Sequence, residues 1–199
     1  MAPLLPIFLN LSGRSVLIVG GGPVAASKLG TLVPTGADIT VVAPAIVDPI
    51  REAGVTLLER PFIDSDLDGR WLVLAAATPE VNAAVARAAE TRRVFVNAVD
   101  DPANATAYLG GIVRRRGVTV AISTAGRAPA LAGLLREGLD AMLPGDDELD
   151  VWLGTADELR RRWRSTDVPM TERRPELADA LLGRYCGTLT SCRAARDLE

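Results

Sequence analysis

The residues with the clearest chemical meaning are Gly20, Gly22 and Ala25, which form a Gly-x-Gly-x-x-Ala pattern. They lie between the apolar, β-branched run 15–19 and the helix-like segment 23–32. In such a unit the first glycine permits a tight turn, the second lets a pyrophosphate approach the backbone, and the small third residue lets the helix pack on the strand. The amides at the helix N-terminus attract phosphate. The spacing predicts a dinucleotide site; the alternative is a glycine-rich turn without a ligand.

The residue that usually holds the ribose in such a site is missing. The second predicted strand, 38–42, is followed by Ala43-Pro44-Ala45 and not by Asp or Glu, although an acid there usually binds the ribose hydroxyls of NAD. The ribose must therefore be held by backbone groups or by another side chain. Because no arginine follows this strand directly to hold the 2′-phosphate of NADP, the sequence favours NAD.

A pair of acids, Asp100 and Asp101, follows the predicted strand 94–99. Ligands of open α/β sheets bind at the carboxyl ends of the strands, and a carboxylate there can take a proton from a substrate that faces the cofactor. The alternative is that Asp-Asp-Pro is a solvated turn. The local pattern does not choose between these interpretations.

The composition restricts the remaining chemistry. Histidine is absent, so carboxylates, hydroxyls, Lys28, a cysteine or the substrate must supply any acid–base group. The two cysteines, Cys186 and Cys192, are too few for a disulfide scaffold or a four-thiolate metal site, and we expect no metal and a reducing cytoplasm. A net charge of −3 gives no reason to expect nucleic acid as a partner.

The sequence also predicts no membrane segment. No apolar stretch approaches the about 20 residues that are needed to span a membrane, and the N-terminus does not have the pattern of a signal peptide.

Strands alternate with helices through the first half of the chain. Apolar and β-branched runs predict strands at 15–19, 38–42, 55–59, 71–76 and 94–99, with helices at 23–32, at 45–53 and from Thr78 onward. This alternation predicts an α/β fold with a Rossmann-type, doubly wound parallel sheet.

The pattern changes after this half. Strands are expected at 107–113 and 118–123, and helices at 129–143, 147–164 and 175–185. We therefore expect an NAD-binding domain at 1–112, a small α+β dimerisation region at 113–145 and a C-terminal helical domain at 146–199. The helix 129–143 carries an apolar face that its small region cannot cover, which predicts a homodimer. That face consists of Leu131, Leu134, Leu135, Leu139 and Met142.

Four segments together resemble one known family. They are Val19-Gly-Gly-Gly-Pro-Val-Ala-Ala-Ser-Lys28, Gly36-Ala-Asp-Ile-Thr-Val-Val-Ala-Pro44, Asn97-Ala-Val-Asp-Asp-Pro102 and Ala121-Ile-Ser-Thr-Ala-Gly-Arg-Ala-Pro-Ala-Leu131. In this order, from about residue 5 to 143, the chain resembles the precorrin-2 dehydrogenase family, which includes the dehydrogenase/ferrochelatase module of sirohaem synthase. The C-terminal segment carries no motif of this family.

The resemblance implies a function and a set of site residues. It implies NAD-dependent oxidation of precorrin-2 to sirohydrochlorin in sirohaem biosynthesis, with Asp100 as the catalytic residue. It also implies that the glycine turn and the end of the second strand contact the cofactor, with Thr78 as a further candidate. The expected cofactor-binding residues are Gly20, Gly22, Pro23, Val24, Ala43, Pro44, Ala45 and Thr78.

The implied substrate carries many carboxylates, which arginine forks bind well. Six arginines lie near the predicted sheet edge and the insert, and a solvated surface charge is the alternative for each: Arg92, Arg93, Arg114, Arg115, Arg116 and Arg127. Of these, Arg114, Arg116 and Arg127 are the expected substrate-binding residues. Thr124 is a further expected substrate-binding residue, and it stands where some relatives carry a phosphorylatable serine. The segments 107–111 and 123–129, which are expected to shape the substrate site and the dimer contact, depart from the family pattern.

Other functions remain open at this level. Some relatives also insert ferrous iron into sirohydrochlorin, so ferrous ion is a second candidate substrate. A non-catalytic NAD sensor or a tetrapyrrole-binding module is the main alternative to an enzyme, and a sensor would bind NAD without ever reducing it. The absence of a catalytic histidine and of a Tyr-x-x-x-Lys pair disfavours the commonest other dehydrogenases.

Overall fold

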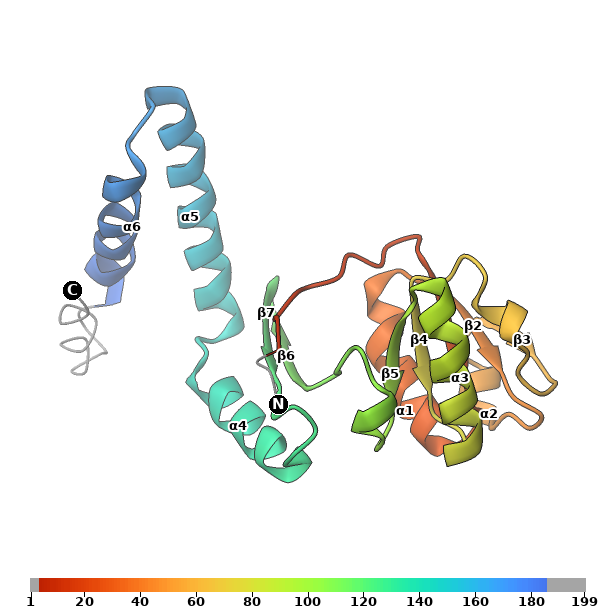
Figure 1. Ribbon diagram of the computed structural model, residues 1–199. Coiled ribbons are helices and arrows are strands. Elements are labelled where there is room, and N and C mark those ends of the chain that lie inside the picture. Colours follow the sequence, from red (N-terminus) through yellow and green to blue (C-terminus); the bar gives the residue numbers. More distant parts are fainter. Residues whose placement is uncertain (1–3, 186–199) are drawn as a thin grey trace. The chain divides into compact units, whose positions relative to one another are not determined.

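The computed structural model describes residues 4–185 (Figure 1). In this range the helices are α1 Pro23–Leu32, α2 Asp48–Arg51, α3 Pro79–Arg92, α4 Pro129–Met142, α5 Asp146–Thr166 and α6 Met170–Tyr185. The strands are β1 Ser15–Val19, β2 Asp38–Val42, β3 Thr56–Leu58, β4 Leu72–Ala75, β5 Phe95–Ala98, β6 Gly111–Arg115 and β7 Val118–Ile122. Short 3-10 turns are η1 Val33–Thr35, η2 Asp64–Leu67 and η3 Pro102–Asn104.

The strands β1 to β5 form one parallel sheet in the order β3-β2-β1-β4-β5. The order reverses at β1, since the chain runs outward to β2 and β3 and then crosses back to β4 and β5. Such a reversal is the switch point at which open α/β sheets bind ligands. The central strands β1 and β4 are almost wholly buried, which explains why their sequences are continuous apolar runs rather than alternating ones.

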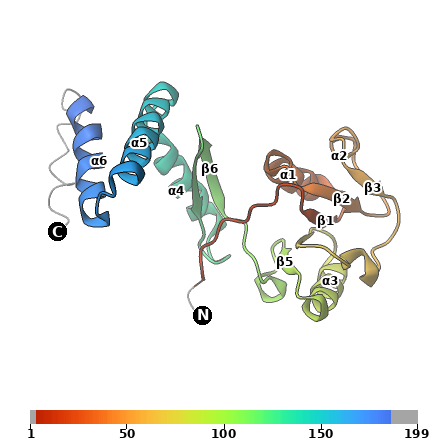
Figure 2. The same ribbon diagram turned by 90° about the horizontal axis from the view of Figure 1, so that it is seen from above.

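Helices cover both faces of this sheet (Figure 2). On one face α1 and α2 pack against the sheet, and Ala25, Leu29 and Ile50 join Ile18 in one buried cluster. On the other face α3 contributes Val85, Ala88 and Ala89 to a cluster with Leu17. Neighbouring residues of β1 point to opposite clusters because side chains alternate along a strand. The predicted doubly wound α/β fold is therefore confirmed.

The chain divides into two compact units. Among the described residues, the first contains 4–111 together with 122–133, and the second contains 112–121 together with 134–185. The predicted boundaries 1–112, 113–145 and 146–199 stay predictions. Cys186 and Cys192 lie outside the described residues. Among the helices that the structure describes, none is long and apolar enough to cross a membrane.

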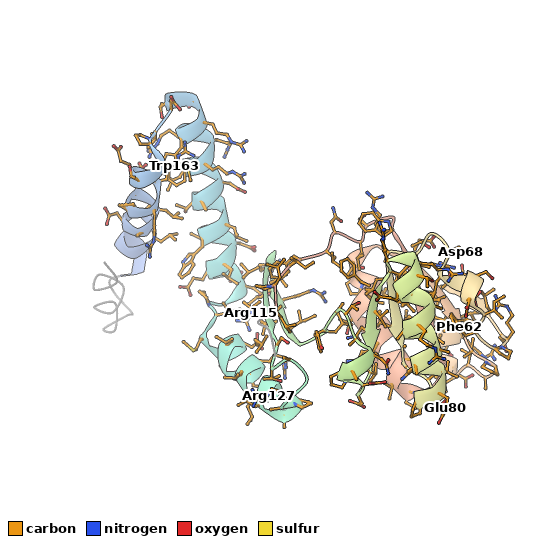
Figure 3. The ribbon with its side chains drawn as sticks, viewed as in Figure 1. Phe62, Asp68, Glu80, Arg115, Arg127 and Trp163 are labelled. Carbon is orange, nitrogen blue, oxygen red and sulfur yellow. The ribbon has the colours of Figure 1, made fainter. Side chains whose placement is uncertain are left out.

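The second unit is held together by arginines and by a helical hairpin (Figure 3). Arg116 and Gly117 have φ of 46° and 81°, which makes the tight turn between β6 and β7. Arg115 donates to the carbonyl oxygens of Leu143 and Pro144 at the end of α4. In the hairpin of α5 and α6, the Trp163 indole donates to Glu176 at 2.5 Å.

Three predicted boundaries are wrong. The helix expected at 45–53 is shortened to Asp48–Arg51. The strand expected from Ala107 starts at Gly111, because the amide of Ala107 instead donates to the carbonyl of Val96 in the main sheet. The last helix starts at Met170 and not at Pro175, although an interior proline costs a hydrogen bond. Within this added first turn the Nε of Arg173 donates to the carbonyl of Val168 at 2.9 Å.

Candidate functional site

The turn after β1 requires glycine at position 20. Gly20 has φ of +128°, and its amide donates to the carbonyl of Val42 at 3.0 Å. A Cβ atom at this position would lie 2.2 Å from the carbonyl oxygen of Ala76. The chain can therefore turn sharply from β1 into α1 only without a side chain at residue 20, as the sequence predicted.

Gly21 joins this turn to the loop that leaves β2, which we call the β2 exit loop (43–47). A Cβ at position 21 would lie 2.0 Å from the carbonyl oxygen of Ala45. The amide of Val47 donates to the carbonyl of Gly21 at 2.9 Å. The glycine turn and the segment Ala43-Pro44-Ala45 are therefore in contact, as expected for two parts of one site. The Gly-x-Gly-x-x-Ala pattern does not single out Gly21, and the only signal for it in the sequence is that the position between the two motif residues is also glycine.

Gly22 differs from its two neighbours. A Cβ at position 22 would meet no atom within 4 Å, so the space in front of it is open. It lies at the start of α1, whose first turn holds no acidic residue and has no side-chain cap. The amides of a first helical turn have no partner in the helix, and here Pro23 and Val24 are exposed beside them. The turn therefore fits the pyrophosphate of a dinucleotide.

The helix α3 also begins at this edge of the sheet, but its N-terminus carries an acidic residue, Glu80. The amide of Glu80 and then the hydroxyl of Thr78 hold the pKa of the Glu80 carboxyl below its ordinary value. Glu80 lies in the first turn of α3 (Figure 3). Its negative charge disfavours a phosphate at this helix end, whereas the first turn of α1 carries no such charge. Thr78 itself is exposed at the edge.

Asp100 lies at the same edge of the sheet as the glycine turn. The amide of Val99, one residue before it, donates to the carbonyl of Ala75 at 2.9 Å, and Ala76 is the residue that Gly20 approaches. Asp100 is exposed and has φ of 56°, a left-handed conformation that Asp tolerates better than most residues. The strand edge thus presents this carboxylate beside the predicted cofactor site.

The turn that carries Asp100 is braced by its neighbours. The Asn104 amide donates to the Asp101 carboxylate at 2.6 Å, so this second acid is engaged within the turn. The hydroxyl of Tyr108 donates to the carbonyl of Pro102 at 3.2 Å. These contacts distinguish the two adjacent acids, because Asp101 stabilises the turn and Asp100 faces solvent.

The loop 123–128 packs against the same turn. A Cβ at Gly126, which has φ of +75°, would lie 3.0 Å from Pro102 and 3.9 Å from the ring of Tyr108. This contact brings Thr124 and Arg127 to the region of Asp100. The hydroxyl of Thr124 accepts the amide of Ala128 at 3.3 Å, and Arg127 is exposed (Figure 3). Neither Gly126 nor Tyr108 belongs to a motif that could be recognised from the sequence as part of this site.

The other arginine candidates belong to the second unit. Arg114 is exposed on β6. Arg116 has its guanidinium 3.3 Å from Asp146 and 3.5 Å from Asp150, so it is partly neutralised at the start of α5. In the range 4–185 no cluster of acids or cysteines has the form of a metal site.

Comparisons with known proteins agree with this geometry. The model of a family described as "Putative NAD(P)-binding" matches residues 7–111, which is more than half of the chain. "Siroheme synthase 3" of Aeromonas hydrophila is 42% identical over 175 residues, which cover 85% of this chain and 37% of the relative. "Siroheme synthase" of Salmonella typhi is also 42% identical, over 85% of this chain and 38% of its own length.

A solved structure described as "SirC, precorrin-2 dehydrogenase" has the same fold, with a TM-score of 0.70, 24% identity and 96% of each chain covered. The chain spans little more than a third of the length of the curated relatives named above. The resemblance to sirohaem synthases that the sequence motifs indicated is confirmed. With its glycine turn, parallel sheet and matched family model, the chain belongs to the "Putative NAD(P)-binding" family.

Proposed function

We propose that this chain is an NAD-dependent dehydrogenase that oxidises precorrin-2 to sirohydrochlorin. The observation that carries the proposal is the placement of Asp100 and the glycine turn at one edge of the parallel sheet, bridged by Ala75 and Ala76. The similarity to siroheme synthases supports the choice of substrate.

Each part of the edge has a role in this proposal. The amides of the glycine turn bind the pyrophosphate, with Gly20, Gly22, Pro23 and Val24 shaping that cradle. Ala43, Pro44 and Ala45 would hold the adenosine ribose through their backbone, and Thr78 would contact the nicotinamide end. When bound, NAD supplies a hydride acceptor.

Asp100 completes the reaction on the protein side. Its carboxylate would take the proton that the tetrapyrrole loses on oxidation, or would hold a ring nitrogen in place. Exposure of this carboxylate keeps it accessible to a large substrate. Arg127 and Thr124, on the loop that packs beside the Asp100 turn, bind carboxylates of the substrate. Arg114 and Arg116 are weaker candidates, because Arg116 already faces two acids.

We further propose a homodimer formed through α4. Its large apolar residues are more than a third exposed and lie on one face of the helix, which is unusual for a face in contact with water. They are Leu131, Leu134, Leu135, Leu139 and Met142. Leu134→Glu should convert the dimer to a monomer in analytical ultracentrifugation, and an unchanged sedimentation coefficient would exclude this face.

The function is tested by an anaerobic assay with enzymatically made precorrin-2 and NAD. Formation of NADH together with the sirohydrochlorin spectrum supports a dehydrogenase. Binding of NAD without its reduction would instead support a sensor. Ferrous ion, added afterwards as a second substrate, tests the separate prediction of iron insertion. The chain is proposed to act in the reducing cytoplasm that its cysteine content suggests.

A further inference from the structure

An acid is present beside the second strand, although none follows that strand in the sequence. In the sheet Val42 of β2 pairs with Leu58 of β3, and the amide of Ala43 donates to the carbonyl of Leu58 at 3.2 Å. Glu59, the next residue after β3, therefore lies next to Ala43 at the carboxyl edge. This is the edge at which an acid at the end of β2 would normally meet the ribose.

Glu59 is bound to one arginine of α2. The guanidinium of Arg51 donates to both carboxylate oxygens of Glu59, at 2.5 and 2.8 Å. The Nε of Arg51 also donates to the carbonyl of Ile46 at 3.1 Å, which attaches the pair to the β2 exit loop. The hydrogen bond from Arg51 lowers the pKa of the Glu59 carboxyl, so this side chain is ionised at neutral pH. Both side chains stay substantially exposed, at 40% and 48%.

The same loop contacts the glycine turn on its other side. Gly21 approaches Ala45, and Val47 donates to the carbonyl of Gly21. A dinucleotide whose pyrophosphate lies at this turn would extend its adenosine ribose along the loop toward Ala43. The ion pair of Arg51 and Glu59 then borders the ribose end of the site.

The other arginine at this end of β3 is also neutralised. Arg60 donates to both carboxylate oxygens of Asp66, at 2.9 and 2.5 Å. An arginine near the second strand is the group that accommodates the 2′-phosphate of NADP. Here the guanidinium groups of Arg51 and Arg60 each already donate to a carboxylate, so neither is available to bind a phosphate.

We propose that Glu59 determines the cofactor specificity of this chain, because its carboxylate repels the 2′-phosphate of NADP and occupies the guanidinium of Arg51 that would otherwise attract it. The inference rests on the dinucleotide site of the proposed function. In this proposal a chain without an acid after β2 still has a means to discriminate between the two cofactors. The charge that discriminates is then the carboxylate of Glu59, which follows β3, and not an acid at the end of β2.

The test is binding of NADH and NADPH to the full chain, each followed by nucleotide fluorescence without any substrate. In Glu59→Gln the ratio of the two affinities should shift roughly tenfold toward NADPH, since one like charge is removed and Arg51 is released. The shift should shrink at high salt because the groups are exposed. Glu90→Gln removes the same charge from the exposed surface of α3 and should leave the ratio unchanged.

A second variant separates the two effects. Adding Arg51→Gln to Glu59→Gln should remove most of the gain in NADPH affinity, because the released guanidinium is then absent. An unchanged affinity ratio in Glu59→Gln, with NADH still bound, would overturn the inference and leave the proposed function intact. Failure of the unaltered chain to bind either nucleotide would overturn the dinucleotide site and the inference together.

Discussion

Gly21 lies directly against Ala45, since a Cβ at position 21 would be 2.0 Å from the carbonyl oxygen of Ala45. The next glycine has no such neighbour, because a Cβ at position 22 would meet nothing within 4 Å. Two adjacent glycines therefore have different reasons to lack a side chain. Gly21 is needed by the fold of the β2 exit loop, whereas the open space at Gly22 is available to a ligand.

Gly21→Ala should destabilise the protein even without cofactor. The new methyl group must push the exit loop away from the turn, and overpacking of this kind costs about 1–3 kcal/mol. The measurement is the free energy of unfolding in urea. Gly30→Ala in α1 is the matched control, because its Cβ meets nothing within 4 Å and Ala favours a helix. Equal stability of the two variants would contradict this reading of Gly21.

Gly22→Ala should leave the stability of the protein unchanged and weaken its binding of NADH. Its unfolding midpoint without cofactor should match that of the unaltered chain, because the methyl group enters open space. NADH affinity should fall roughly tenfold or more, since the methyl group occupies the place of the pyrophosphate. Fluorescence titration measures this loss. Retained affinity would show that the phosphates do not lie at this glycine.

Asp100→Asn should lower turnover at least about a hundredfold, the lower range for loss of a proton-transferring group. Asn tolerates the left-handed backbone of this position, at φ 56°, so the fold should persist. NADH affinity should change little. Asp101→Asn is the matched control, because an amide oxygen can still accept the bond from Asn104. If both variants turn over like the unaltered enzyme, Asp100 has no part in the reaction.

Gly126→Ala should impair the tetrapyrrole site rather than the cofactor site. Alanine at φ +75° is strained by about 1–2 kcal/mol, and its methyl group would lie 3.0 Å from Pro102. The loop with Thr124 and Arg127 should shift, which raises KM for precorrin-2 while NADH affinity stays constant. Gly133→Ala, whose Cβ meets nothing within 4 Å, serves as the control. An unchanged KM for precorrin-2 in Gly126→Ala would show that the loop 123–128 does not take part in binding the substrate.

Asp66→Asn should reduce stability in a pH-dependent way. The hydrogen bond from Arg60 holds the pKa of this buried carboxyl below its ordinary 3.8. A lowered pKa in the folded state stabilises the protein above the unfolded pKa, and this contribution is lost as pH falls through the folded value. The variant should lose about 1.5–3 kcal/mol at pH 7. Urea unfolding should show a smaller difference below pH 3.8, and a constant difference would argue against the ion pair.

Much of the first unit could be predicted from short segments. The runs 15–19 and 38–42 coincide with β1 and β2 as observed, because strands buried on both faces must be continuously apolar. Pro79 after Thr78 marked the start of α3 for a similarly local reason. The strand start expected at Ala107 was wrong because the amide of Ala107 donates to the carbonyl of Val96, a contact with another strand that the local pattern does not contain.

By itself, the sequence determined the order of strands and helices, the glycine turn and the acid after β5, since each is encoded within a few neighbouring residues. The tertiary structure alone decided that Glu59 lies beside Ala43 and that Gly126 packs on Pro102. These residues are far apart in the chain. Their contacts follow from the register of the parallel strands and from loop packing, which no local pattern of residues records.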